Sequence, residues 1–124
     1  MNDRPRSSRL TFDTRDVDGT VVVGVTGEVD LDTAPRLREA IAVAIAEAAG
    51  DPCVVDLTTV GYLGSAGLTA LVDATREAEA QDAPLRIVVD ANRPVIRPIE
   101  ITGLDRVLHL YHSVEEALDG SPTS

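Results

Sequence analysis

Apolar and β-branched residues occur in short runs along the chain, and turn-forming residues separate the runs. Leu10–Thr14 and Thr20–Val25 flank Asp18-Gly19, a pair that tolerates positive φ angles and favours a tight turn. These two runs therefore predict a β-hairpin. Three later runs also predict strands: Pro52–Leu57, Leu85–Val89 and Val107–Tyr111. The middle one is apolar apart from Arg86, which is typical of a strand covered on both faces.

Helical spacing of apolar residues fills the intervals between the later strands. The first helix is expected to begin with Asp32 or Thr33 as its N-cap, to hold Pro35 in its first turn and to stop at Gly50. A loop over Thr58–Gly64 is expected to lead into a second helix. The inward-facing residues of that helix recur at helical spacing: Leu68, Leu71, Val72 and Thr75. Its outward-facing residues are Thr69, Asp73, Arg76 and Glu77.

The last third of the chain predicts two more helices. One begins near Asn92 and ends near Gly103, and Pro98 should kink or shorten it because proline has no N–H to donate. The other is short, and Ser113 with Glu116 is expected to form a capping box at its start.

The resulting order, β-β-α-β-α-β-α-β-α, predicts one small α/β domain. Strands separated by helices are most simply parallel with right-handed crossovers, and the hairpin adds one antiparallel edge. We expect a mixed, mostly parallel sheet of about five strands with about four helices. The expected domain covers residues 9–119, between flexible tails at 1–8 and 120–124.

Composition removes several classes of function. The 124 residues include 11 basic and 21 acidic side chains, a formal net charge of −10, and every basic residue is an arginine. Without lysine the chain has no P-loop lysine, Schiff-base lysine or lysine nucleophile. Three aromatic residues are too few for a base-stacking platform, and the negative charge repels phosphate backbones. We therefore expect no nucleic-acid partner.

Cysteine and histidine give no sign of a cofactor or a metal. Cys53 is the only cysteine, which excludes an internal disulfide and a cysteine-rich zinc site, so it either packs in a strand or has a redox role. His109 and His112 lie three positions apart, cannot share one face of a strand and are interpreted as incidental. The sequence shows no signal-peptide core and no apolar run that could span a membrane, so a cytoplasmic protein without a membrane partner is expected.

A serine stands among small residues where the second helix is expected to begin. Gly61, Gly64 and Gly67 surround Ser65; Gly64 and Ala66 leave its hydroxyl unshielded, and Gly67 allows a second backbone to approach. Four interpretations are open: an N-cap, the nucleophile of a hydrolase, part of a phosphate cradle, or a regulatory phosphorylation site. The Gly-x-Ser-x-Gly pattern of a hydrolase nucleophile is incomplete, which disfavours the hydrolase. The loop has no basic residue, which disfavours the phosphate cradle.

Three motifs carry a resemblance to a known family. The first is Asp56-Leu57-Thr58 followed by Tyr62-Leu63-Gly64-Ser65-Ala66-Gly67-Leu68. The second is Gly27-Glu28-Val29-Asp30 with Thr33-Ala34, and the third is Thr102-Gly103-Leu104-Asp105. In this order they resemble the motifs of bacterial anti-sigma factor antagonists, small proteins of the STAS-domain class. The resemblance covers about Leu10 to Leu118, nearly the whole expected domain.

The resemblance implies a regulatory protein that is not an enzyme. Its unphosphorylated form would bind an anti-sigma factor that is also a serine kinase, which releases the sigma factor. Phosphorylation of Ser65 would abolish this binding, and a phosphatase would restore it. Thr33, Gly64, Ala66 and Gly67 are the further motif positions implied in partner binding. In the family, aspartate usually stands at the position of Gly64 and a hydroxyl residue at that of Ala66, so Ser65 is the sole acceptor here.

Three acidic residues follow the second strand. Glu28, Asp30 and Asp32 should lie near Ser65, because parallel strands end at the same edge of a sheet. They form either a solvated helix cap or an acidic rim that pairs with arginines of the kinase. An alternative function, from a different class, is a STAS adaptor subunit of a transporter ATPase or of a signalling scaffold.

Overall fold

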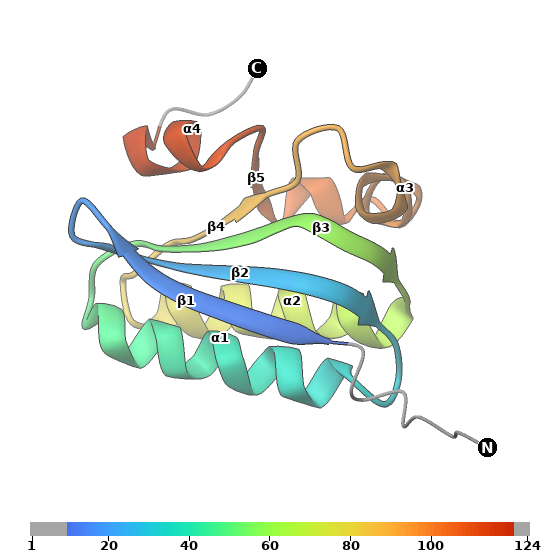
Figure 1. Cartoon of the computed structure of the whole chain (residues 1–124), viewed down its shortest axis with the longest axis horizontal. Coiled ribbons are helices and arrows are strands. Elements are labelled where there is room, and N and C mark those ends of the chain that lie inside the picture. Colours follow the sequence, from blue (N-terminus) through green and yellow to red (C-terminus); the bar gives the residue numbers. More distant parts are fainter. Residues whose placement is uncertain (1–9, 121–124) are drawn as a thin grey trace.

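The computed structural model describes residues 10–120, in which five strands form one mixed sheet in the order β1-β2-β3-β4-β5 (Figure 1). The strands are β1 Thr11–Val17, β2 Thr20–Val29, β3 Cys53–Leu63, β4 Leu85–Val88 and β5 His109–Tyr111. β1 pairs antiparallel with β2, and the other three pairings are parallel. The predicted hairpin and mixed sheet are confirmed. The tails expected at 1–8 and 120–124 fall outside the described residues, apart from Gly120.

Helices cover both faces of this sheet. They are α1 Ala34–Ala48, α2 Ser65–Ala80, α3 Arg93–Ile101, α4 Val114–Asp119 and a short 3-10 helix, η2 Leu104–Arg106. α1 and α2 lie side by side against one face, and α4 lies against the opposite face (Figure 1). The predicted order of elements is confirmed. Within residues 10–120, none of the helices combines the length and the apolar character that crossing a membrane requires.

Two apolar clusters hold the layers together. The larger one joins the sheet to α1, α2 and α3, and its bulkiest fully buried side chains include Leu37, Ile41, Ile45, Leu57, Leu71, Leu85, Ile87 and Ile99. The smaller one lies under α4 and consists of Val22, Val54, Val88, Tyr111 and Ala117. Successive side chains of a strand point to opposite faces. In β4, Val88 therefore enters the smaller cluster and its neighbour Ile87 the larger, so this strand is covered on both faces as predicted.

The third strand corrects the predicted loop over Thr58–Gly64. β3 continues through Leu63, six residues beyond the expected end at Leu57. It continues because β2, also longer than expected, offers a partner as far as Val29. Two register shifts in this ladder absorb the extra residues of β3. Because the β2–β3 ladder is long, the two strands end side by side at the same edge of the sheet.

Helix boundaries mostly follow the predicted signals. Thr33 is the N-cap of α1, and Pro35 lies in the first turn, where a missing N–H costs little. The helix ends at Ala48, and Ala49 takes the left-handed conformation at φ 50° before Gly50 at φ 95°. An alanine therefore closes this helix, where a glycine was expected.

The second half of the chain is organised by a few side-chain contacts. Asn92, the N-cap of α3, donates its side-chain amide to the carbonyl oxygens of Leu57 at 2.8 Å and Val60 at 2.7 Å. Pro98 lies within α3 without ending it. β5 is shorter than expected because η2 precedes it. Ser113 Oγ accepts the N–H of Glu116 at 3.1 Å, which confirms the expected cap of α4.

Candidate functional site

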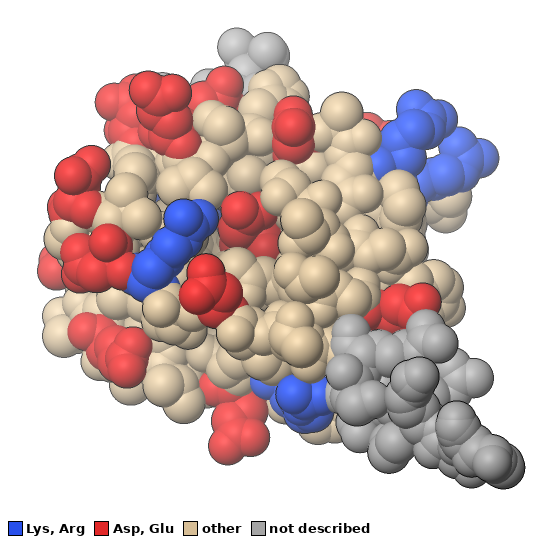
Figure 2. Space-filling view, viewed as in Figure 1, with Lys and Arg blue, Asp and Glu red and all other residues tan. Residues whose placement is uncertain are grey.

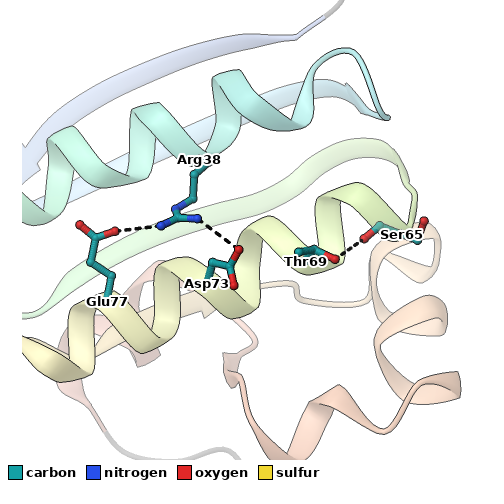
Figure 3. Close-up of polar contacts among 5 residues, drawn as sticks. All are labelled: Arg38, Ser65, Thr69, Asp73 and Glu77. Atoms are coloured by element: carbon teal, nitrogen blue, oxygen red, sulfur yellow. Dashed lines mark hydrogen bonds and ion pairs between the residues drawn. The ribbon is translucent and has the colours of Figure 1, made fainter.

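Ser65 is the first residue of α2 and is exposed. Gly64, in an extended conformation, is the N-cap, so the interpretation of Ser65 as an N-cap is wrong. The carbonyl oxygen of Ser65 accepts a hydrogen bond from Thr69 Oγ1 at 3.1 Å (Figure 3). Its hydroxyl makes no hydrogen bond with any other residue between 10 and 120. The oxygen is therefore presented to solvent at the start of a helix.

The glycines beside Ser65 have different neighbours from those expected. At Gly67 a Cβ atom would lie 2.6 Å from Leu63 Cδ1 and 2.7 Å from Val29 Cγ1. Side chains, rather than a second backbone, approach Gly67, and its lack of a Cβ lets α2 settle onto the ends of β2 and β3. At Gly64 a Cβ atom would lie 3.0 Å from the hydroxyl oxygen of Tyr62. The tyrosine side chain therefore packs against the N-cap.

The turn between β2 and α1 is built from Asp30 and Thr33. One carboxylate oxygen of Asp30 accepts the backbone N–H groups of Asp32 and Thr33, each at 3.0 Å. Thr33 is fully buried; its Oγ1 accepts the N–H of Asp30 at 2.9 Å and donates to the carbonyl oxygen of Glu28 at 2.8 Å. These two side chains hold the shape of the turn, whereas Asp32 is exposed.

The acidic residues line an open hollow at the ends of β2 and β3. Its volume is about 680 Å³ and its lining consists of Glu28, Asp30, Leu31, Asp32, Gly61 and Tyr62. We call this the acidic hollow. Leu31 is 79% exposed and Tyr62 51% exposed, so apolar surface lies beside the carboxylates. Gly64 N–H donates to the Val29 carbonyl oxygen at 2.9 Å, which ties this edge to the start of α2.

A second depression lies between α1 and α2, and it shares Leu31 with the acidic hollow. Mainly apolar surface lines it, contributed by Leu31, Ala34, Pro35, Arg38, Ala66, Thr69, Ala70 and Asp73. We call it the interhelical groove. Arg38 crosses it and contacts Asp73 at 3.2 Å and Glu77 at 3.3 Å (Figure 3). The predicted outward position of both acids is consistent with this contact, but spacing along one helix could not reveal their partner on another.

The exposed side chains of Leu31 and Tyr62 extend the site beyond the acids and Ser65. Leu31 has a signal in the sequence by which it could have been found: it is a large apolar residue between two aspartates in a turn. Such a residue has no core to enter, so it is a candidate for contact with a partner.

Cys53 and the two histidines lie away from this edge. Burial, and then the negative charge of Glu47, raise the pKa of the fully buried Cys53 thiol to about 11. The expectation that Cys53 packs in a strand is confirmed. His109 contacts Glu79 at 3.2 Å and His112 lies 3.9 Å from Glu116, both on the surface. No group of metal-binding side chains occurs in the part of the chain that the structure describes.

The fold and the motifs at its β2 and β3 ends define the class. Residues 11–117 match the STAS domain, and the chain belongs to that family. It is 36% identical over 113 residues to the anti-sigma-F factor antagonist RsfB of Mycobacterium tuberculosis, covering 90% of this chain and 88% of that protein. It is 33% identical over 107 residues to the anti-sigma-B factor antagonist of Listeria monocytogenes, covering 86% of this chain and 90% of that protein.

A solved structure shows the same likeness. An anti-sigma factor antagonist from Mycobacterium paratuberculosis has a TM-score of 0.79 to this chain at 36% identity, covering 90% of this chain and 92% of the other. The resemblance predicted from the three motifs is confirmed.

Proposed function

We propose that this protein is an anti-sigma factor antagonist that binds an anti-sigma factor through the edge around Ser65. The observation that carries the proposal is the exposed hydroxyl of Ser65 at the first position of α2, beside the exposed side chains of Leu31 and Tyr62. Exposed apolar residues next to charged ones are typical of a protein-binding surface. The similar proteins of known name, which cover most of this chain, support the same function.

The partner is expected to present basic side chains to this edge. The chain has a net charge of −10, and acidic side chains are spread over the face shown in Figure 2, where arginines are few. The acidic hollow adds carboxylates beside the apolar contacts. Such complementarity accelerates association and fixes orientation more than it adds affinity.

Phosphorylation of Ser65 is the proposed release step. The anti-sigma factor, acting as a serine kinase, transfers the γ-phosphoryl group of ATP to Ser65 Oγ, which loses its proton, and ADP leaves. The first hydrogen bond at the start of α2 joins Leu68 N–H to the Gly64 carbonyl oxygen, so the N–H groups before Leu68 have no partner within the helix. They and the helix dipole favour an added anion, so the domain stays folded.

The effect of the phosphate therefore falls on the partner. A small hydroxyl between Gly64 and Ala66 becomes a group with a charge of about −1.5 to −2 at neutral pH. A partner surface that fits closely around the small hydroxyl has no room for the added group, and burying its charge in that contact is costly. A loss of about 3–4 kcal/mol of binding free energy would weaken association a few hundredfold, which is enough for release.

Mass spectrometry of the intact chain tests the modification. The chain is incubated with ATP and an anti-sigma factor kinase, and Ser65→Ala is compared with Thr69→Ala, which removes an exposed hydroxyl one turn further along α2. We expect one added phosphate in the natural chain and in Thr69→Ala, and none in Ser65→Ala. A phosphate that persists in Ser65→Ala would refute the assignment.

A further inference from the structure

β1 lies at the edge of the sheet, and its outer side pairs with no other residue between 10 and 120. Within that range its only backbone pairing is the antiparallel ladder with β2 (Figure 1). An edge strand of seven residues presents a row of N–H and carbonyl groups that can pair with another chain. The side chains along β1 decide which chain can do so.

Charged side chains on an edge strand ordinarily prevent pairing with other chains. In β1 the charged residues are Asp13, Arg15 and Asp16, and all three are exposed. Asp13 and Arg15 make no hydrogen bond or ion pair with any other residue between 10 and 120. Because they are two positions apart, both side chains point to the same face of the sheet. One face of this edge therefore presents an acid and an arginine side by side.

A second copy of β1 is complementary to these charges. When two identical antiparallel strands pair about a two-fold axis perpendicular to the sheet, the axis passes through a residue, because directly opposed side chains lie on the same face. With the axis at Thr14, Asp13 of each copy lies opposite Arg15 of the other. The remaining opposed residues are Thr11 with Val17, Phe12 with Asp16, and Thr14 with Thr14. All seven residues of β1 are paired in this register.

The two neighbouring registers are unfavourable. Moving the axis to Asp13 sets the two copies of Asp13 opposite each other, and moving it to Arg15 sets two arginines opposite each other. Like charges that are directly opposed destabilise a pair of strands. Each of these shifts also leaves two residues of β1 without a partner on the second copy. The register about Thr14 is therefore selected both by charge and by length.

We propose that this protein forms a two-fold homodimer in which two β1 strands pair antiparallel about Thr14 and join the two sheets into one. The proposal goes beyond the antagonist function and does not depend on it. The axis reverses the strand direction, so the edges around Ser65 lie at opposite ends of the dimer and both stay open to a partner. A contact limited to one strand is small, and exposed ion pairs are weak, so the association is weak and reversible.

Disulfide trapping tests the register. In Thr14→Cys the new thiols belong to directly opposed residues, whose Cβ atoms lie about 4.5–5.5 Å apart. Thr11→Cys is the matched control: it is the same substitution at another exposed position of β1, but residue 11 would lie about 20 Å from its copy. Cys53 is buried with a raised pKa and does not react.

With diamide as the oxidant, we expect the covalent dimer of Thr14→Cys to form at least about tenfold faster than that of Thr11→Cys, because only the first pair is held within bonding reach. Equal rates, or no covalent dimer from either variant, would overturn the proposal.

Charge reversal tests the ion pairs, with dimerisation measured by sedimentation equilibrium. Asp13→Arg opposes like positive charges and Arg15→Asp opposes like negative charges, so each variant alone should dimerise about tenfold more weakly than the natural chain. An equal mixture of the two variants restores opposite charges at both pairs and should form a heterodimer. The double variant Asp13→Arg/Arg15→Asp keeps the net charge and should dimerise as the natural chain does.

Arg93→Asp is the control for net charge. Like Arg15→Asp it leaves 10 basic and 22 acidic residues, but it changes an exposed position of α3, which packs on β3. It should dimerise as the natural chain does. Equal weakening by Arg93→Asp and Arg15→Asp, or a mixture of the two β1 variants that does not associate, would overturn the proposal. A natural chain that remains monomeric at about 1 mM would overturn it as well.

Discussion

Replacing Gly67 with alanine would place a methyl group where the structure has no room for one. The new Cβ atom would lie 2.6 Å from Leu63 Cδ1 and 2.7 Å from Val29 Cγ1, and both of these side chains are buried. Val29 is β-branched and its own Cβ would lie 3.3 Å from the new methyl group, so it cannot turn away cheaply. The ends of β2 and β3 must therefore separate from α2.

The magnitude follows from two opposing effects. Overpacking of a buried contact costs about 1–3 kcal/mol, and the higher helix propensity of alanine returns up to about 1 kcal/mol. We expect a net loss of about 1–2 kcal/mol in the free energy of unfolding, measured by urea denaturation. Gly61→Ala is the control, because a Cβ there meets nothing closer than the Gly27 carbonyl oxygen at 4.0 Å. A Gly67→Ala chain as stable as the natural one would refute the account of this contact.

Three further predictions address the supports of the site. Asn92→Ala removes two hydrogen bonds to carbonyl oxygens of β3 and should lower the free energy of unfolding by about 1–3 kcal/mol in urea. Asp30→Ala should lower the free energy of unfolding by about 1–3 kcal/mol, because the Asp30 carboxylate holds the turn. Asp32→Ala should change the free energy of unfolding by no more than about 0.5 kcal/mol, but it should slow association with the anti-sigma factor at low salt. The thiol of Cys53 has a pKa of about 11 in the folded chain against 9.0 ordinarily, so stability should fall as pH rises from 9 to 11. In Cys53→Ala this fall should be absent.

Each of these expectations has an outcome that contradicts it. An Asn92→Ala chain with unchanged stability would mean that its amide does not support β3. If Asp30→Ala were stable and Asp32→Ala unstable, the assignment of the turn would be wrong. An alkaline fall in stability that is the same in Cys53→Ala would trace the effect to other groups.

Local patterns were sufficient for the order of elements. The apolar spacing of α1 and α2 and the turn at Asp18-Gly19 depend on neighbours within a few residues, so the sequence predicts them well. The length of β3 could not be predicted in this way. Its last residues are strand because β2 lies beside them, and a contact between residues 28 and 62 leaves no local trace.

The candidate site, too, could be predicted only where its signal is local in the sequence. Ser65 and its small neighbours stand out in the sequence, and the structure places the hydroxyl at an exposed position. The different tasks of the acids could not be predicted, since Asp30 and Asp32 look alike until the turn is known. The interhelical groove could not be predicted from the sequence either, because it depends on the packing of α1 against α2 and on the contacts of Arg38.

The most direct test of the central claim compares the affinity of an anti-sigma factor for the unmodified chain and for the chain phosphorylated at Ser65, by isothermal titration calorimetry. The account predicts binding by the unmodified chain and by Ser65→Ala, a loss of affinity of a few hundredfold on phosphorylation, and thermal melting temperatures that stay nearly the same. Equal affinity for the two forms, or a phosphorylated chain that fails to bind because it has unfolded, would contradict it.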